Sequence, residues 1–86
     1  MNESITSIRR VLRDHARLAV DADAIAADAD LFQAGMSSYA SVNVMLALED
    51  TFDVQFPDRM LKRSVFESIA AIERALVELL AQTPIS

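Results

Sequence analysis

Two adjacent serines, Ser37 and Ser38, follow the only glycine of the chain, Gly35, and are its most suggestive chemical feature. A serine hydroxyl can accept a hydrogen bond from a free backbone N–H at a helix start, and glycine permits a tight preceding turn. We therefore predict a loop that closes on Gly35 and a helix that begins at Ser37 or Ser38. Taken alone, the pattern favours serines that serve only as helix caps. The alternative is a hydroxyl that carries the chemistry of the protein.

Other nucleophiles and metal sites find little support. The chain has no cysteine, which excludes disulfides, thiolate metal sites and cysteine nucleophiles. Its single histidine, His15, leaves no His-based metal cluster. A serine hydrolase would need a base beside Ser38, and His15 is expected at the edge of the apolar stripe of a helix, with no identifiable orienting acid.

Four aspartates alternate with alanines and invite comparison with a calcium-binding loop: Asp21, Asp23, Asp28 and Asp30. An EF-hand loop that begins at the first of them requires glycine at its sixth position and a carboxylate at its twelfth. The chain has Ala26 and Phe32 there, and a loop that begins at the third aspartate fails at the same two positions. The spacing therefore argues against calcium.

Charge is unevenly distributed along the chain. The net charge is -5, and residues 18–58 hold eight carboxylates but no lysine or arginine. Such a segment repels nucleic acid and anionic lipid and attracts basic protein surfaces, so we expect neither nucleic-acid nor membrane partners. No apolar run approaches the roughly 20 residues that span a bilayer, and no secretory signal is evident. These features predict a soluble, cytoplasmic protein.

Length and composition predict one all-α domain over residues 1–86, because the chain has one glycine and two prolines. Apolar spacing predicts helices over residues 3–18, 38–52 and 64–82, with a short helix or turn after Pro57. Ser64 and Glu67 fit a capping box for the last helix. A long acidic loop over residues 20–37 joins the first two helices. The predicted core includes Phe32, Leu48, Phe52 and Ile69.

The charged face of the first helix and the second apolar stripe of the second helix each allow a simple interpretation. The arginines of the first helix, including Arg9 and Arg10, are expected to form a solvated face. Val42 and Leu46 lie one step around the second helix from its main apolar face. This second stripe indicates either a helix packed on two sides or a surface that meets a partner protein.

Three collinear segments resemble acyl and peptidyl carrier proteins. Residues 30–39, D-L-F-Q-A-G-M-S-S-Y, resemble the D-L-F-x-x-G-x-D-S-L signature of that family. Residues 47–57 resemble the A-L-E-x-x-F segment, with its alternating hydrophobic residues and final proline, that closes the second helix of the family. Residues 64–69 resemble the opening of its last helix. The match covers nearly the whole chain, and it implies a four-helix carrier bundle of three main helices and one short helix.

The resemblance implies that Ser38 carries a covalent 4′-phosphopantetheine arm, which a separate phosphopantetheinyl transferase attaches, with Gly35 and Ser37 completing the attachment site. The thiol of that arm would hold an acyl or aminoacyl group as a thioester, although the chain has no cysteine. The protein itself would be a monomeric carrier and not an enzyme. An unmodified helical adaptor with a carrier-like fold is the alternative.

The implied partners are the transferase, an acyl- or aminoacyl-loading ligase or synthetase, and downstream acyl-transferring enzymes. We expect the partner-binding residues to be Met36, Tyr39, Val42, Asn43, Leu46, Asp50 and Met60. The chain departs from the family pattern where Ser37 replaces aspartate and Tyr39 replaces leucine. The exposed face of the second helix, often acidic in fatty-acid carriers, is expected here to present Ala40, Asn43 and Asp50. Because rim charges select partners, this favours dedicated partner enzymes.

Overall fold

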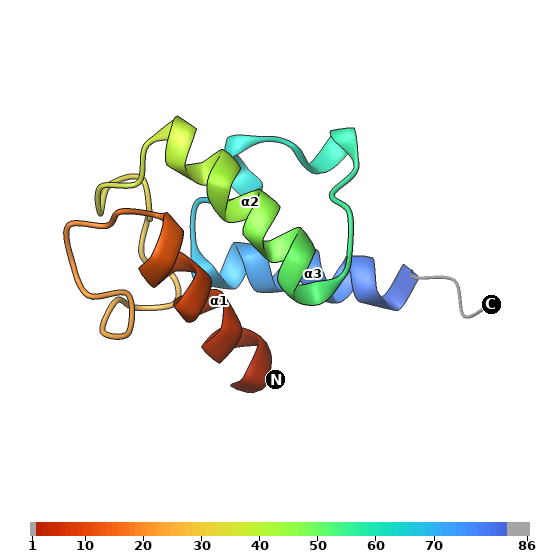
Figure 1. Cartoon of the computed structure of the whole chain (residues 1–86), viewed down its shortest axis with the longest axis horizontal. Helices are drawn as coiled ribbons and strands as arrows, with labels where there is room; N and C mark the ends of the chain where they lie inside the picture. The colour runs from red at the N-terminus through yellow and green to blue at the C-terminus, as the bar shows by residue number, and fades with distance from the viewer. Residues whose placement is uncertain (1, 83–86) are drawn as a thin grey trace.

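The computed structural model describes residues 2–82 (Figure 1). The regular secondary structure of these residues consists only of helices, which loops connect. The elements are α1 (Asn2–His15), α2 (Ser38–Phe52), the 3-10 helices η1 (Asp58–Met60) and η2 (Arg63–Val65), and α3 (Ile69–Gln82). The all-α prediction is confirmed, with three main helices. The short helical segment expected after Pro57 consists of the two 3-10 helices.

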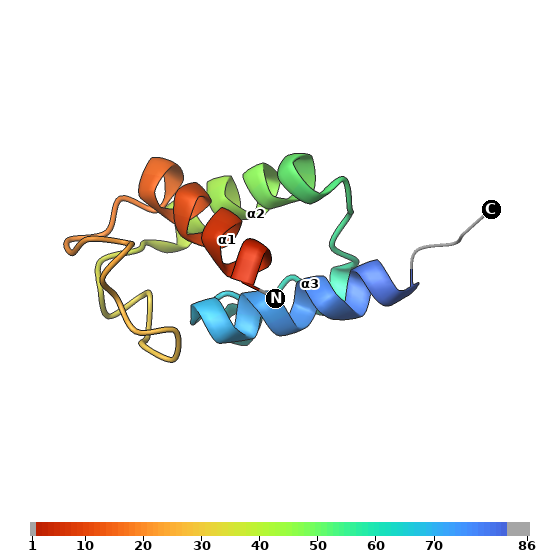
Figure 2. The same ribbon diagram turned by 90° about the horizontal axis from the view of Figure 1, so that it is seen from below.

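The core lies between α3 and the other two helices. Figure 2 shows α3 along one side of the molecule, with α1 and α2 on the other. Each helix contributes apolar residues at helical spacing, because only one stripe of each faces inward. The largest fully buried side chains are Ile8, Leu12, Leu31, Val44, Leu48, Ile69, Ile72 and Leu76.

The four predicted core residues divide into two pairs. Leu48 and Ile69 have no exposed surface, which confirms their placement. Phe32 and Phe52 are only partly buried and pack against the edge of the core. The buried aromatic pair is instead Phe56 and Phe66, whose ring centroids lie 5.3 Å apart in an edge-to-face arrangement.

Two helix boundaries differ from the sequence prediction. The first helix ends at His15 instead of residue 18, and Arg17 adopts a left-handed backbone with φ of 56°. The last helix begins at Ile69, not at residue 64, so the predicted capping box of Ser64 and Glu67 is wrong. Ser68 supplies the cap instead, since its Oγ accepts a hydrogen bond from the backbone N–H of Ala71 at 3.0 Å.

Backbone hydrogen bonds join the α1–α2 loop, residues 16–37, to the first turn of α3 and to the residues just before it. The N–H of Leu31 donates to the carbonyl of Glu67 at 2.7 Å, and the N–H of Ala70 donates to that of Ala27 at 2.9 Å. Leu31 itself is fully buried. These contacts hold the loop beside the start of α3, so that the chain arrives at the N-terminus of α2 from a fixed direction.

Arg9 of α1 also anchors this loop, which corrects its expected place on a solvated face. Its Nη1 donates to the carbonyl of Ala22 at 2.8 Å and to that of Ile25 at 2.7 Å. A guanidinium can satisfy several carbonyls at once because it presents five N–H donors. Within residues 2–82, no helix has the length and apolar character that crossing a membrane requires.

Candidate functional site

The two adjacent serines have different roles at the start of α2. Ser37 is the N-cap, with an extended backbone, and its Oγ accepts a hydrogen bond from the backbone N–H of Ala40 at 3.0 Å. This bond satisfies one of the free donors of the first helical turn. The predicted start of the second helix is confirmed, and Ser37 is the residue that caps it.

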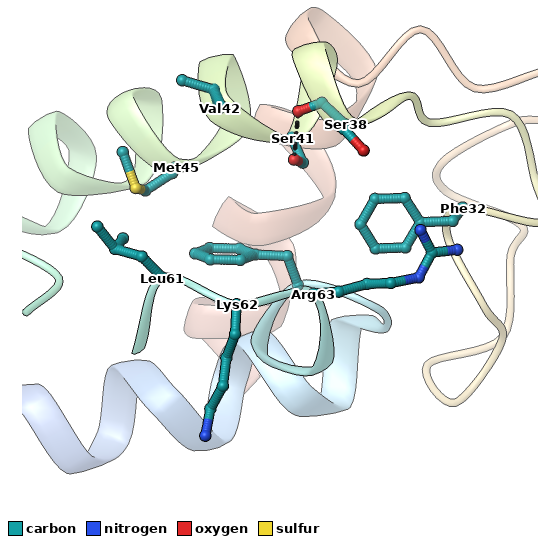
Figure 3. A pocket seen from close by; sticks show the side chains of 9 residues that line it. Phe32, Ser38, Ser41, Val42, Met45, Leu61, Lys62 and Arg63 are labelled. Carbon is teal, nitrogen blue, oxygen red and sulfur yellow. Dashed lines mark hydrogen bonds between the residues drawn. The ribbon is translucent and has the colours of Figure 1, made fainter. Parts of the chain in front are cut away.

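The Ser38 side chain is exposed. Its Oγ has no hydrogen-bond partner among residues 2–82, although its carbonyl accepts a bond from Ser41 Oγ at 2.6 Å. Figure 3 shows the Ser38 side chain pointing away from that bond and toward Phe32 and Arg63. The first turn of α2 holds no acidic residue. The partial positive charge of the helix N-terminus therefore favours an anionic group at Ser38.

Gly35 makes the turn that leads into α2. Its φ is +118°, a conformation that residues with a Cβ rarely adopt. A Cβ at this position would lie 3.0 Å from the backbone nitrogen of Ala19, which donates to the carbonyl of Ala34 at 2.8 Å. The glycine therefore allows two segments of the α1–α2 loop to cross closely, just before the serines.

A groove of about 500 Å³ opens beside Ser38, between α2 and residues 61–66 (Figure 3). We call it the Ser38 groove. Its lining residues are Phe32, Ser38, Ser41, Val42, Met45, Leu61, Lys62, Arg63 and Phe66. The lining is mainly apolar. The cationic side chain of Arg63 lies at one end, where its guanidinium carbon is 4.0 Å from the centre of the Phe32 ring.

An exposed apolar stripe, the outer face of α2, begins one residue after Ser38. Tyr39 is 81% exposed, Val42 50% and Leu46 52%. Asn43 and Asp50 are also exposed and share this face through their helical spacing. Five of the seven predicted partner-binding residues therefore lie on one accessible surface.

The other two, Met36 and Met60, are core residues and correct that prediction. Met36 is 2% exposed and Met60 4%. Met36 turns inward directly after Gly35, while Met60 closes η1. Ala40, expected on the exposed face of the second helix, is also buried, at 3%. None of the three can contact a partner without a rearrangement of the core.

Sequence reasoning missed Leu61 and Arg63 as residues of the site. Both come from the irregular segment between α2 and α3, where 3-10 geometry does not follow the 3.6-residue period of an α-helix. The sequence offers one signal: Lys62 and Arg63, two adjacent cations, directly follow two apolar residues. That signal does not indicate which cation faces the serine.

An exposed serine at the start of the second helix, on a small helical bundle with a groove beside it, is an arrangement that suits a carrier domain. Residues 7–76 match the family described as the phosphopantetheine attachment site, and the chain belongs to that family. Phosphopantetheine is therefore its cofactor. The exposed hydroxyl of Ser38 and the positive end of α2 fit that group, and the thiol of the arm explains how a chain without cysteine carries thioesters.

The chain is similar to known carrier proteins. The chain is 49% identical over 67 residues to the aminoacyl carrier protein of Agrobacterium fabrum, a match that covers 78% of this chain and 81% of the relative. It is also 44% identical to the solution structure of an Agrobacterium tumefaciens protein, with a TM-score of 0.72 and coverage of 90% and 93%.

Two further structures contain a ligase. A chain in the crystal structure of an engineered Bradyrhizobium japonicum glycine:carrier protein ligase, complexed with a carrier protein from Agrobacterium tumefaciens and ATP, matches with a TM-score of 0.86 and 43% identity. The match covers 88% of this chain and 99% of that one. A chain in the complex of the Bradyrhizobium japonicum ligase with glycylated carrier protein matches at 0.73 and 29% identity, covering 85% and 97%.

Proposed function

We propose that Ser38 is the residue that carries the phosphopantetheine arm, and that the cargo is an amino acid held as a thioester. The observation that carries the attachment site is the division of roles between the two serines. Ser37 Oγ is engaged with the N–H of Ala40, whereas Ser38 Oγ is exposed and has no partner within residues 2–82. A transferase needs a hydroxyl that it can reach without breaking a helix cap.

The surroundings of Ser38 supply position and charge but no catalytic base. His15, the one histidine, is exposed at the end of α1. The protein is then a substrate of its partner enzymes and not an enzyme itself. The transferase removes the hydroxyl proton, and Ser38 Oγ attacks the phosphorus that bears pantetheine in the donor. The phosphoanhydride bond of the donor breaks, and its nucleotide phosphate leaves. The N-terminus of α2 stabilises the resulting phosphodiester anion on Ser38. The thiol at the end of the arm supplies the thioester chemistry.

The relatives support an aminoacyl cargo. The Agrobacterium fabrum relative is an aminoacyl carrier protein, and the glycine:carrier protein ligases act with carriers of the same fold. We therefore propose an aminoacyl-loading ligase as the partner that charges this chain, with glycine as the first amino acid to test. The other proposed partners are a phosphopantetheinyl transferase, which acts before loading, and an acyl-transferring enzyme, which acts after it. The cytoplasmic location and monomeric state stay predictions.

The outer face of α2 supports a docking role for these partners. Tyr39, Val42 and Leu46 place exposed apolar surface within one to eight positions of Ser38 along the same helix. An enzyme that docks there can reach the arm attached at the helix start. Asn43 and Asp50 border the same face and can select among partners through their polarity and charge.

The test is intact-mass measurement after incubation with a phosphopantetheinyl transferase and its donor. We expect one added phosphopantetheine on wild type and on Ser37→Ala, and none on Ser38→Ala. Modified protein is then incubated with a glycine-activating ligase, ATP and glycine, and the mass of one glycyl group is expected. Unchanged mass in wild type would refute the carrier proposal and favour the unmodified adaptor. Modification that survives Ser38→Ala would refute the site.

A further inference from the structure

Arg63 is a cationic residue in the same groove as Ser38. It lines the Ser38 groove together with that serine, and its guanidinium carbon lies 4.0 Å from the centre of the Phe32 ring. In Figure 3 the guanidinium stands beside Phe32, on the side of the groove toward which the Ser38 side chain points. Residues 18–58 contain no lysine or arginine, so neither α2 nor most of the loop before it supplies another cation.

The charge of Arg63 has no acidic partner within the described residues, unlike the charges of Arg13 and Arg59. Arg59 pairs with Glu78 at 3.0 Å, and Arg13 pairs with Asp23 at 3.3 Å. Arg63 has instead the face of an aromatic ring as its recorded contact. A guanidinium held over an aromatic ring by cation–π attraction keeps N–H donors available for another partner. Those donors match two oxygens of a phosphate.

Lys62, the neighbouring cation, does not share this placement. Its ammonium points toward α3 and away from Ser38, although its stem borders the groove (Figure 3). Two adjacent residues of the same charge are thus oriented differently by the backbone of η2. Lys62 therefore provides a matched control for Arg63.

We propose that Arg63, oriented by Phe32, binds the phosphodiester that modification creates on Ser38, and thereby directs the start of the arm into the Ser38 groove. This inference rests on the proposed function, because it requires Ser38 to carry the group. The phosphodiester is a permanent anion and complements the guanidinium. The apolar side chains of Met45, Leu61 and Phe66 then lie ahead of it, and they suit the branched carbon centre of pantetheine.

The role of Arg63 is positioning. By holding the phosphodiester at the end of the groove, Arg63 reduces the number of conformations that the arm adopts close to Ser38. A docked partner would meet the arm in a restricted set of directions. Lysine in place of arginine would keep the charge but lose the guanidinium that contacts the Phe32 ring and its paired N–H donors.

The experiment compares the unmodified and modified full chain by NMR, using arginine Nε–Hε signals and contacts between arm protons and ring or methyl protons of the groove. Intact mass is measured first on every sample. On modification we expect the Arg63 Nε–Hε signal to move, and contacts to appear between the arm and Phe32 or Met45. Raising the salt concentration should reduce the shift, because screening weakens an exposed ion pair.

The variants separate this inference from its alternatives. Arg63→Gln should lose the arm contacts, Arg63→Lys should retain only part of them, and Lys62→Gln should keep them at the wild-type level. Circular dichroism checks that each variant is folded. Full modification with an unmoved Arg63 signal would overturn this inference alone. If Arg63→Gln and Lys62→Gln lost the arm contacts equally, the contacts would depend on net charge alone, and a specific role of Arg63 would be refuted. A wild type that gains no mass would overturn the proposed function, and this inference with it.

Discussion

Ser37 Oγ accepts a hydrogen bond from the backbone N–H of Ala40 at 3.0 Å, and this contact separates two serines that the sequence presents side by side. The first serine is committed to starting α2, while the second, Ser38, has an exposed side chain without a partner in the part of the chain that the structure describes. Stability and modification should therefore depend on different residues, which substitutions can show.

We expect Ser37→Ala to lower the free energy of unfolding by about 1 kcal/mol, because it removes an N-cap acceptor. Ser37→Asp should restore the cap, since a carboxylate also accepts this bond. Ser38→Ala should change the free energy of unfolding by no more than about 0.5 kcal/mol, as surface substitutions usually do. Urea denaturation of the three variants measures this. A larger loss from Ser38→Ala than from Ser37→Ala would contradict the assignment of roles.

The sequence predicts α2 well because both of its ends carry local signals. Ser37 provides the cap at one end, and at the other Asp53 adopts a left-handed conformation, with its N–H bonded to the carbonyl of Glu49. The start of α3 is different. Residues 64–68 carry helical signals, yet the N–H of Ala70 bonds to the carbonyl of Ala27 in the α1–α2 loop. Ser68 caps α3 locally, but Ser64 offers a similar local signal four residues earlier. Contacts that are distant in sequence, such as this bond to Ala27, accompany the later start, and no local pattern indicates them.

The site follows the same division. The turn at Gly35 and the start of α2 at Ser38 could be predicted, because a turn and a helix start are local features. The Ser38 groove could not, since Phe32, Met45 and Arg63 come from three separate stretches that meet only in the folded chain. Met36 and Met60, which were predicted to bind partners, are both buried in the core. Neither lies on an α-helix, so no periodicity indicates which way its side chain points.

Gly35→Ala should lower the free energy of unfolding by more than about 1 kcal/mol, because the native backbone conformation is strained for alanine. The new Cβ would also lie 3.0 Å from the backbone nitrogen of Ala19. Since this turn positions Ser38, the rate of phosphopantetheine attachment should fall as well. Thermal unfolding and a timed mass assay measure the two effects. Wild-type values in both would show that Gly35 is not required for the turn.

Leu48 and Leu46 should respond differently to the same substitution, although they lie two positions apart on α2. Leu48 is fully buried, so Leu48→Ala should cost about 2–5 kcal/mol of folding free energy. Leu46 is 52% exposed, and Leu46→Ala should cost much less while weakening the binding of a loading ligase. Urea denaturation and titration calorimetry test the pair. Unchanged ligase affinity in Leu46→Ala would argue against the outer face of α2 as the docking surface.

Glu49 connects the end of α2 to the segment that follows. Its Oε2 accepts a hydrogen bond from the backbone N–H of Phe56 at 2.8 Å, close to the buried pair of Phe56 and Phe66. Glu49→Ala removes the acceptor of a partly buried donor and should cost about 1–3 kcal/mol. Asp50→Ala, on the exposed side of the same turn, should stay within about 0.5 kcal/mol. Equal effects in urea denaturation would contradict this role.

Arg9 should control how firmly the α1–α2 loop is held, because its Nη1 bonds to the carbonyls of Ala22 and Ile25. Arg9→Met keeps an apolar stem of similar length but removes both bonds, each of which involves a charged donor. We expect backbone amides of the loop to exchange their hydrogens about 10-fold faster or more in this variant, while those of α2 exchange less affected. Arg10→Met, on an exposed position of the same helix, is the matched control. Since this loop leads into Gly35 and Ser38, faster loop exchange should be accompanied by slower attachment of the arm. Loop exchange that is equal in the two variants would show that residues other than Arg9 hold the loop.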